Sequence, residues 1–174
     1  MLFNDFFKKG FISSLLAFLL SSPLHAEPEV LGWLENAYLE PYTVKIRAKL
    51  DTGAKTSSIY AINVEPFETD GSLWVRFTLP KSALKSEGSK KDIHIEKPVI
   101  RETKIKEHIG DSVSRYVVEI EFCLNGKNYV TPVTLADRSN FNYPLLLGRN
   151  ILKDNFLVDP GKTFTSTKSC LHID

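Results

Sequence analysis

Apolar and polar residues alternate along two long stretches of this chain. Within residues 44–50, and again within 73–79, every second side chain is apolar. Because successive side chains of a strand point to opposite faces, this period predicts strands with one buried and one solvated face. Such strands are typical of antiparallel sheets, so the pattern favours an all-β fold. The apolar positions are Val44, Ile46, Ala48 and Leu50 in the first stretch and Leu73, Val75, Phe77 and Leu79 in the second.

Shorter signals extend the predicted set of strands. Asn125-Gly126 separates the runs 114–124 and 127–135, and both turn residues tolerate positive φ, which predicts a tight hairpin. Pro98 indicates an edge strand or a bulge, and Pro160-Gly161 should end the last strand. A short helix is expected over residues 151–155. The other strand-like runs are 29–41, 57–61, 63–67, 93–107 and 156–159.

Two segments lack this periodic pattern. Residues 81–92 are rich in Lys, Ser and Glu, and they predict a surface loop. The tail, residues 166–174, is expected to be loosely held unless Cys170 is bonded.

The first 26 residues have the pattern of a secretory signal peptide. Lys8 and Lys9 precede an apolar run over residues 11–20, and Leu24 and Ala26 suit cleavage after Ala26. The run is too short to span a bilayer comfortably, so no stable membrane insertion is expected after cleavage, although an uncleaved anchor is the alternative. The mature chain, residues 27–174, is then expected to be one domain in the periplasm or outside the cell.

The charge of the mature chain indicates no polyanionic partner. The full chain has 22 basic and 21 acidic residues, and removing residues 1–26 takes away Lys8, Lys9 and Asp5, which leaves 20 of each. A neutral chain gives no electrostatic reason to expect nucleic acid or an anionic membrane as a partner.

The chain has two cysteines, Cys123 in a strand-like run and Cys170 near the C-terminus. In an exported protein they could form one disulfide that ties the tail to the body, and their distance in space decides this. A cysteine nucleophile is the alternative, but no local signature places a histidine beside either thiol.

An Asp-Thr-Gly turn follows the predicted strand 44–50. The strand delivers Asp51 at its end, and Gly53 lets the backbone turn sharply and leaves room for a substrate or a second subunit. Thr52 adds a hydroxyl that can bond locally or across an interface. Because Asp and Gly are common in ordinary turns, the tripeptide alone does not indicate an active site. A second motif makes the signal more specific. That motif is the apolar run 143–147, which ends in Gly148-Arg149-Asn150.

With these two motifs in this order, the chain resembles the retropepsin-like aspartic proteases. In that family, a strand carrying Asp-Thr-Gly-Ala is paired with a later apolar segment that ends in Gly-Arg-Asn and leads into a helix. The resemblance extends over about residues 31–164. It implies a retropepsin-like closed acid-protease β-barrel with one short C-terminal helix.

The sequence is also similar to a small bacterial family labelled ATP-dependent zinc proteases, over segments 48–54, 137–138, 146–149 and 156–160. The residues do not support this label. The four histidines are scattered without the spacing of zinc ligands, and no glycine-rich phosphate-binding loop is present. We therefore expect no metal and no cofactor. The histidines are His25, His94, His108 and His172.

The resemblance implies a role for each motif residue. Asp51 would be catalytic, and four small residues around it would support the active site or bind substrate. Three charged residues would be structural, two of them as a local ion pair or through hydrogen bonds. The supporting residues are Thr52, Gly53, Ala54 and Gly148, and the structural ones are the pair Asp137 and Arg138, together with Arg149.

One position departs from the retroviral pattern. The residue after Asp-Thr-Gly-Ala is usually acidic there and pairs with the arginine of Gly-Arg-Asn, but here it is Lys55. Arg149 then needs another carboxylate, and Asp137 and Asp159 are the candidates.

A single Asp51 cannot complete an aspartic protease, because the mechanism needs two carboxylates that share one proton. A homodimer that brings two copies of Asp51 to a two-fold axis is the economical solution. We therefore expect an exported endopeptidase that acts on peptides or proteins, with isopeptide or glutamyl bonds implied by relatives that occur beside glutamate ligases. A catalytically degenerate peptide-binding or regulatory module and a metal-dependent amidase are the alternatives.

Overall fold

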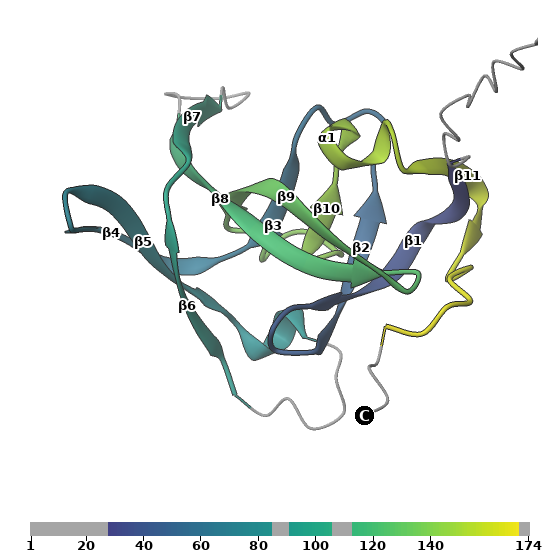
Figure 1. Ribbon diagram of the computed structural model, residues 1–174, viewed down its shortest axis with the longest axis horizontal. Coiled ribbons are helices and arrows are strands. Elements are labelled where there is room, and N and C mark those ends of the chain that lie inside the picture. The colour runs from purple at the N-terminus through teal and green to yellow at the C-terminus, as the bar shows by residue number, and fades with distance from the viewer. Residues whose placement is uncertain (1–27, 85–90, 106–112, 171–174) are drawn as a thin grey trace, which may run out of the picture.

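The computed structural model describes residues 28–84, 91–105 and 113–170, which form strands around one core and one short helix (Figure 1). The predicted signal peptide lies outside these residues. Within them, no helix is long and apolar enough to cross a membrane. The strands are β1 (Glu29–Leu39), β2 (Val44–Leu50), β3 (Ser57–Tyr60), β4 (Ile62–Thr69), β5 (Ser72–Leu79), β6 (Ile93–Pro98), β7 (Arg101–Ile105), β8 (Val113–Leu124), β9 (Lys127–Ala136), β10 (Leu145–Leu147) and β11 (Phe156–Thr163), and the helices are η1 (Lys81–Ala83) and α1 (Arg149–Leu152).

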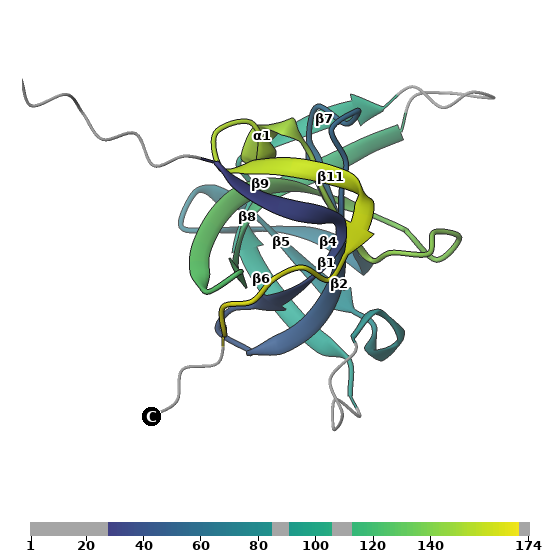
Figure 2. The same cartoon turned by 90° about the vertical axis from the view of Figure 1, so that its right-hand side faces the viewer.

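The larger sheet curls on itself, as Figure 2 shows from the side. Its strand order is β11-β1-β2-β10-β3-β9-β8-β7, and β1 also pairs with β8. That closing contact consists only of the pairs Tyr38 with Cys123 and Leu39 with Phe122. The expected all-β retropepsin-like fold is confirmed. The expectation of a closed barrel is wrong in its strict sense, because closure depends on this short contact and because β7 and β11 extend beyond it.

The alternating pattern places the core where the sequence predicts it. In β2, Ile46, Ala48 and Leu50 are buried, while Arg47 between them is exposed. The same alternation in β5 buries Val75 and Phe77 completely. Burial of these apolar side chains stabilises the packing of the two sheets by about 25 cal/mol for each Å² of apolar surface removed from water.

A second, three-stranded sheet has the order β4-β5-β6. The sequence predicts one strand over residues 93–107, but the chain forms β6 and then β7, which belong to different sheets. Pro98 ends β6 at the edge of its sheet, as expected for a residue without an N–H group. The next two residues then bond to different strands, Val99 N to Leu73 O and Ile100 N to Val117 O.

The predicted hairpin is confirmed in β8 and β9. Asn125 and Gly126 both have positive φ, at 51° and 77°. Eight residue pairs from Val117–Thr134 to Leu124–Lys127 connect the two strands.

The C-terminal elements differ from the prediction in their bounds. Helix α1 begins at Arg149 and ends at Leu152, earlier than the expected 151–155. Strand β11 continues through Pro160-Gly161 to Thr163, so the expected stop is wrong. It is an edge strand parallel to β1, where a missing N–H costs nothing, and its register shifts between Gly32 and Leu34.

The tail is fastened to the body at several points. Cys170 forms a disulfide with Cys123. A loosely held tail was expected only if Cys170 was not bonded. Asn125 Oδ1 accepts hydrogen bonds from the backbone N–H groups of Thr167 and Lys168 at 3.0 and 3.1 Å. Residues 171–174 lie outside the described part of the chain.

Glu35 holds the beginning of this tail from inside the protein. Its carboxylate is fully buried and accepts hydrogen bonds from the backbone N–H groups of Gly32, Thr165 and Ser166 at 3.0, 2.8 and 3.2 Å. The hydroxyls of Thr165 and Ser166 donate two more, at 2.7 and 2.9 Å. These five bonds compensate for the lost hydration of the carboxylate.

We predict that Glu35→Ala lowers the free energy of unfolding by about 3 kcal/mol, because several buried donors lose their acceptor. Urea denaturation of the oxidised protein measures this change. Glu68→Ala is the matched control, since Glu68 is exposed on β4, and it should cost less than about 0.5 kcal/mol. Equal losses in the two variants would show that the Glu35 bonds do not stabilise the tail.

Candidate active site

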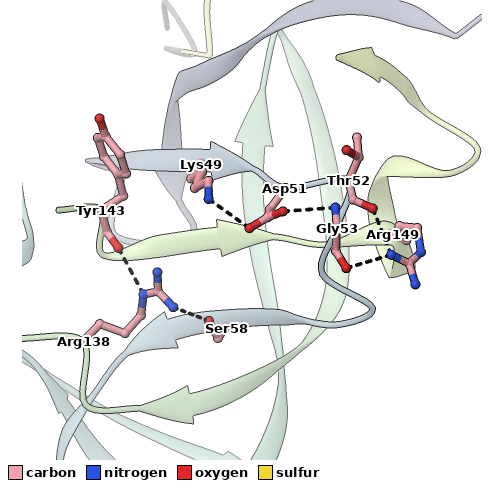
Figure 3. A network of polar contacts seen from close by, with 8 residues as sticks. All are labelled: Lys49, Asp51, Thr52, Gly53, Ser58, Arg138, Tyr143 and Arg149. Atoms are coloured by element: carbon pink, nitrogen blue, oxygen red, sulfur yellow. Dashed lines mark hydrogen bonds and ion pairs between the residues drawn. The ribbon is translucent and has the colours of Figure 1, made fainter. Parts of the chain in front are cut away.

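The position of Asp51 follows from the way that three strands meet. Strand β10 lies between β2 and β3, parallel to the first and antiparallel to the second. The chain therefore leaves β2, crosses the end of β10 and returns as β3. Asp51 begins this crossing, and its N–H donates to Leu147 O at 2.8 Å. Figure 3 shows the carboxylate beside the turn.

Both oxygens of the Asp51 carboxylate have a partner in the same chain. Oδ1 accepts a hydrogen bond from Gly53 N at 3.1 Å, and Oδ2 lies 3.1 Å from Lys49 Nζ. Lys49 is two residues earlier on the strand, so its side chain lies on the same face. The Asp51 side chain is 25% exposed and therefore reachable from solvent.

These contacts set the charge of Asp51. Partial burial by itself raises the pKa of the Asp51 carboxyl, but the hydrogen bond and the charge of Lys49 lower it, together with the N–H groups of Gly53 and Ala54. The net result is a pKa below the ordinary value of 3.8. In the single chain, Asp51 is an ionised carboxylate at neutral pH.

Arg149 fixes the turn through the backbone. Its Nη1 donates to the carbonyl oxygens of Thr52 and Gly53, both at 2.9 Å. The carbonyl of Ala54 in turn accepts a hydrogen bond from Arg149 N at 2.9 Å, and Ala54 N donates to Asp51 O at 3.1 Å. The structure thus brings Asp51 and all four supporting residues together, with Gly148 directly before Arg149.

The expected carboxylate partner of Arg149 is wrong. Asp137 Oδ1 accepts a hydrogen bond from Ser139 N at 2.9 Å, and Asp159 forms an ion pair with Lys162 at 3.0 Å. Two carbonyl oxygens already satisfy Arg149, so the acidic residue that Lys55 replaces is not needed to hold it.

Gly148 supports the turn by allowing close packing. A Cβ atom at this position would lie 2.7 Å from the carbonyl carbon and oxygen of Thr56. Gly148 N also donates to Ser57 Oγ at 3.0 Å, and Ser57 Oγ donates to Asn150 Oδ1 at 2.8 Å. Ser57 and Asn150 were not predicted as site residues, although their polarity directly beside the two motifs was a signal for them.

Asp137 and Arg138 form no ion pair with each other, and each makes hydrogen bonds to other residues. Arg138 is 7% exposed, and it donates from Nε to Tyr143 O at 3.0 Å and from Nη1 to Ser58 Oγ at 2.8 Å. Asp137 contacts Ser139 instead. Sequence reasoning missed the contact of Lys49 with Asp51 and the charge interaction between Arg138 and Asp51.

Metal ligands do not gather in the described segments, where no group of three or more His, Cys, Asp or Glu residues could hold an ion. His94 is described, and its Nδ1 lies 3.1 Å from Thr78 Oγ1. The other three histidines lie outside the described residues. The arrangement around Asp51 therefore offers one carboxylate on a rigid turn, and general acid–base chemistry needs a second group to receive or give the proton.

We predict that Gly148→Ala lowers the free energy of unfolding by about 3 kcal/mol, because the added methyl meets backbone atoms that cannot give way. Thermal or urea denaturation measures the loss. Gly53→Ala is the comparison, since its Cβ would meet only Asp51 Oδ1, at 3.2 Å, and it should cost less than about 1 kcal/mol. The prediction fails if both variants are equally stable.

We also predict that Lys49→Gln raises the pKa of the Asp51 carboxyl, because the nearest cation is removed. A folded-state pKa below the unfolded one stabilises the fold above pH 3.8, and this contribution is lost as the pH falls through the lowered value. Carboxyl carbon NMR during a pH titration measures the midpoint. Lys45→Gln, on the same strand but four residues further from Asp51, should leave the midpoint almost unchanged.

Comparison with known proteins agrees with this geometry. The chain matches the family described as "Retropepsin-like aspartic endopeptidase RimB" over residues 30–169. It is 36% identical to a protein of unknown function from Legionella pneumophila whose crystal structure has been solved. The TM-score is 0.65, and the match covers 80% of this chain and 98% of that one.

Two curated relatives carry the name "Probable alpha-L-glutamate ligase". The relative from Shewanella pealeana is 38% identical over 120 residues, which are 68% of this chain and 25% of the relative. The one from Desulfotalea psychrophila is 35% identical over 115 residues, 66% of this chain and 24% of the relative. The chain thus spans about a quarter of the length of these relatives. The match to the family extends over most of the chain, and the protein belongs to the RimB-like family of retropepsin-like aspartic endopeptidases.

Proposed function

We propose that this protein is an exported aspartic endopeptidase whose active form is a homodimer with one Asp51 from each protomer at its centre. The observation that carries the proposal is the Asp51 turn. Its carboxylate is oriented by Gly53 N, and its backbone is clamped by Arg149 at the end of β2. A carboxylate held by a rigid support is what general acid–base catalysis requires.

The second acid comes from a second copy of the chain. Asp51 forms no contact with another carboxylate in the described part of the chain, and two like charges at hydrogen-bond distance can share one proton. Thr52, Gly53 and Arg149 are exposed around Asp51, which leaves this end of the barrel open for docking. A symmetric interface would then place the two turns face to face.

In the dimer, the ionised Asp51 takes a proton from a water molecule, and the water oxygen attacks the scissile carbonyl carbon. The protonated Asp51 of the other protomer gives its proton to the carbonyl oxygen, which forms a neutral tetrahedral diol. The diol then collapses: the Asp51 that took the proton of water gives it to the peptide nitrogen, the other Asp51 takes a proton from a diol hydroxyl, and the C–N bond breaks to release the amine and the new carboxyl group. Atoms and charges balance with water as the only co-reactant.

The substrate class that we propose is a peptide with glutamyl or isopeptide bonds. Lys49 contacts the single acid of each protomer, Arg149 clamps the turn that carries it, and Arg138 interacts with it through space, so three cations are associated with one ionised Asp51. Cationic surroundings favour an acidic chain. The name of the curated relatives supports the same chemistry, since it concerns glutamate.

One observation supports a second candidate, a degenerate module that binds peptides without cleaving them. Lys49 contacts Asp51 Oδ2. Because Gly53 N bonds to Oδ1, Oδ2 is the oxygen that would share a proton with the second carboxylate. If Lys49 remained there in the dimer, the pair would bind a peptide but not activate water.

We predict that Asp51→Asn lowers hydrolysis of a polyglutamyl peptide by at least about 1000-fold, because the amide cannot accept the proton of water. Mass spectrometry of the products between pH 4 and 7 measures the rate. Asp154→Asn, an exposed residue after helix α1, is the matched control and should leave the rate unchanged.

Sedimentation of the same samples completes the test. Activity should follow the fraction of dimer and should survive a metal chelator. A variant at Asp51 that still cleaves would refute the aspartic mechanism. A dimer of the unaltered protein that binds the peptide but never cleaves it would establish the degenerate module.

A further inference from the structure

Among the described residues, the buried cation Arg138 contacts only neutral groups. It is 7% exposed, and its guanidinium donates to Tyr143 O and Ser58 Oγ. The ring of Phe141 lies against it, with the centroid 4.6 Å from Cζ. In the described part of the chain, no carboxylate oxygen lies within 4.0 Å of it. A buried arginine without an anion is costly, and two of the five N–H groups of Arg138 have a hydrogen-bond partner among the described residues.

The acidic groups near Arg138 do not pair with its guanidinium. Burial lowers the pKa of the Arg138 guanidinium, and the charge of Arg115 lowers it further, while the charge of Asp51 raises it. The adjacent Asp137 is fully exposed to solvent and bonds to Ser139 instead. Neither Asp51 nor Asp137 contacts the guanidinium, so Arg138 has no anionic partner among the described residues.

Strand pairing places Arg138 on the same face as the Asp51 carboxylate. Leu146 of β10 pairs with Lys49 of β2 on one side and with Ser58 of β3 on the other. Paired residues point to the same face, so the Ser58 hydroxyl that binds Arg138 lies two strand spacings, about 10 Å, from Lys49. Figure 3 shows Arg138 and Ser58 on one side of β10 and Lys49 and Asp51 on the other.

Arg138 also lines a cavity that could receive a ligand. The cavity has a volume of about 290 Å³, and its wall comes from β3, η1 and the loop that leads into β10. Tyr60, Ser82 and Asn142 bring hydroxyl and amide groups to it, and Phe141 brings the ring that covers the guanidinium.

We propose that this cavity is a substrate subsite in which Arg138 binds a carboxylate of the peptide near the scissile bond. The inference rests on the proposed function, because it assumes that Asp51 marks the point of cleavage. An extended peptide advances about 3.3 Å per residue, so 10 Å corresponds to a carboxylate within about three residues of that bond.

The guanidinium selects a carboxylate over other groups for geometric reasons. Its remaining N–H groups lie in one plane and match the two oxygens of a carboxylate, which neither an amide nor a hydroxyl can replace. The carboxylate can come from a Glu or Asp side chain, or from the free C-terminus of the peptide. Both sources share the same chemistry, and different peptides distinguish them.

The test measures peptide binding to the Asp51→Asn chain by calorimetry, so that no cleavage occurs. Acetyl-tetraglutamate amide should bind at least about 10-fold more tightly than acetyl-tetraglutamine amide. Arg138→Met should lower this preference at least about 5-fold, while Lys49 and Arg149 maintain the remainder. Arg101→Met, which removes an exposed arginine on β7, is the matched control and should preserve it. Acetyl-tetraglutamine with a free carboxylate tests the second source, and tighter binding than its amide identifies the C-terminus.

Each outcome decides the inference. Equal binding of all three peptides, or an undiminished preference in folded Arg138→Met, would overturn it. If Arg138→Met does not fold, Asn142→Asp takes its place, since a carboxylate on the cavity wall should weaken tetraglutamate binding at least about 10-fold without touching Arg138. Failure of the proposed function is a separate result, because a protein that cleaves nothing can still show the Arg138-dependent preference.

Discussion

The position of β10 between β2 and β3 is the constraint on which the candidate site depends. Strands that follow one another in the chain usually pair directly, but here a strand from the far end of the sequence separates them. The connecting turn must therefore cross the end of β10, and the bond from Asp51 N to Leu147 O fixes where it starts. Arg149 follows β10 after one residue, so the strand that spaces the turn also carries the side chain that clamps it. Fold and site are thus one structural unit.

The same arrangement explains how much of the site the sequence could predict. Asp51 was identifiable because the alternating pattern of β2 and the Asp-Thr-Gly turn are both local signals. The hairpin at Asn125-Gly126 was identifiable for the same reason, since its positive φ values are a property of those two residues. The role of Gly148 was implied by resemblance, and the distances to Thr56 give its physical reason.

The parts that could not be predicted depend on contacts between distant segments. Arg149 was expected to need a carboxylate, but carbonyl oxygens are present at every residue, and sequence does not reveal which of them face a side chain. Strand β11 passes through Pro160 because β1 lies beside it, a tertiary contact that overrides local propensity. Glu35 reads as an ordinary charged residue in a strand, and only the folded tail shows it as a buried acceptor of five hydrogen bonds.

The contact between Lys49 and Asp51 would link the charge of the site to formation of the proposed dimer. Gly53 N occupies Oδ1, so Oδ2 is the oxygen that would face the second Asp51, and Lys49 contacts it in the single chain. The lysine side chain is 40% exposed and flexible, so it can move aside at a small entropic cost while its charge remains nearby. Two carboxylates that approach each other repel, and a cation beside each one reduces this repulsion. The same cations oppose the binding of a second proton, which extends the singly protonated state of the pair to lower pH. In the proposed dimer, a lysine at this position would therefore favour assembly of the carboxylate pair and shift the pH range in which the pair could work.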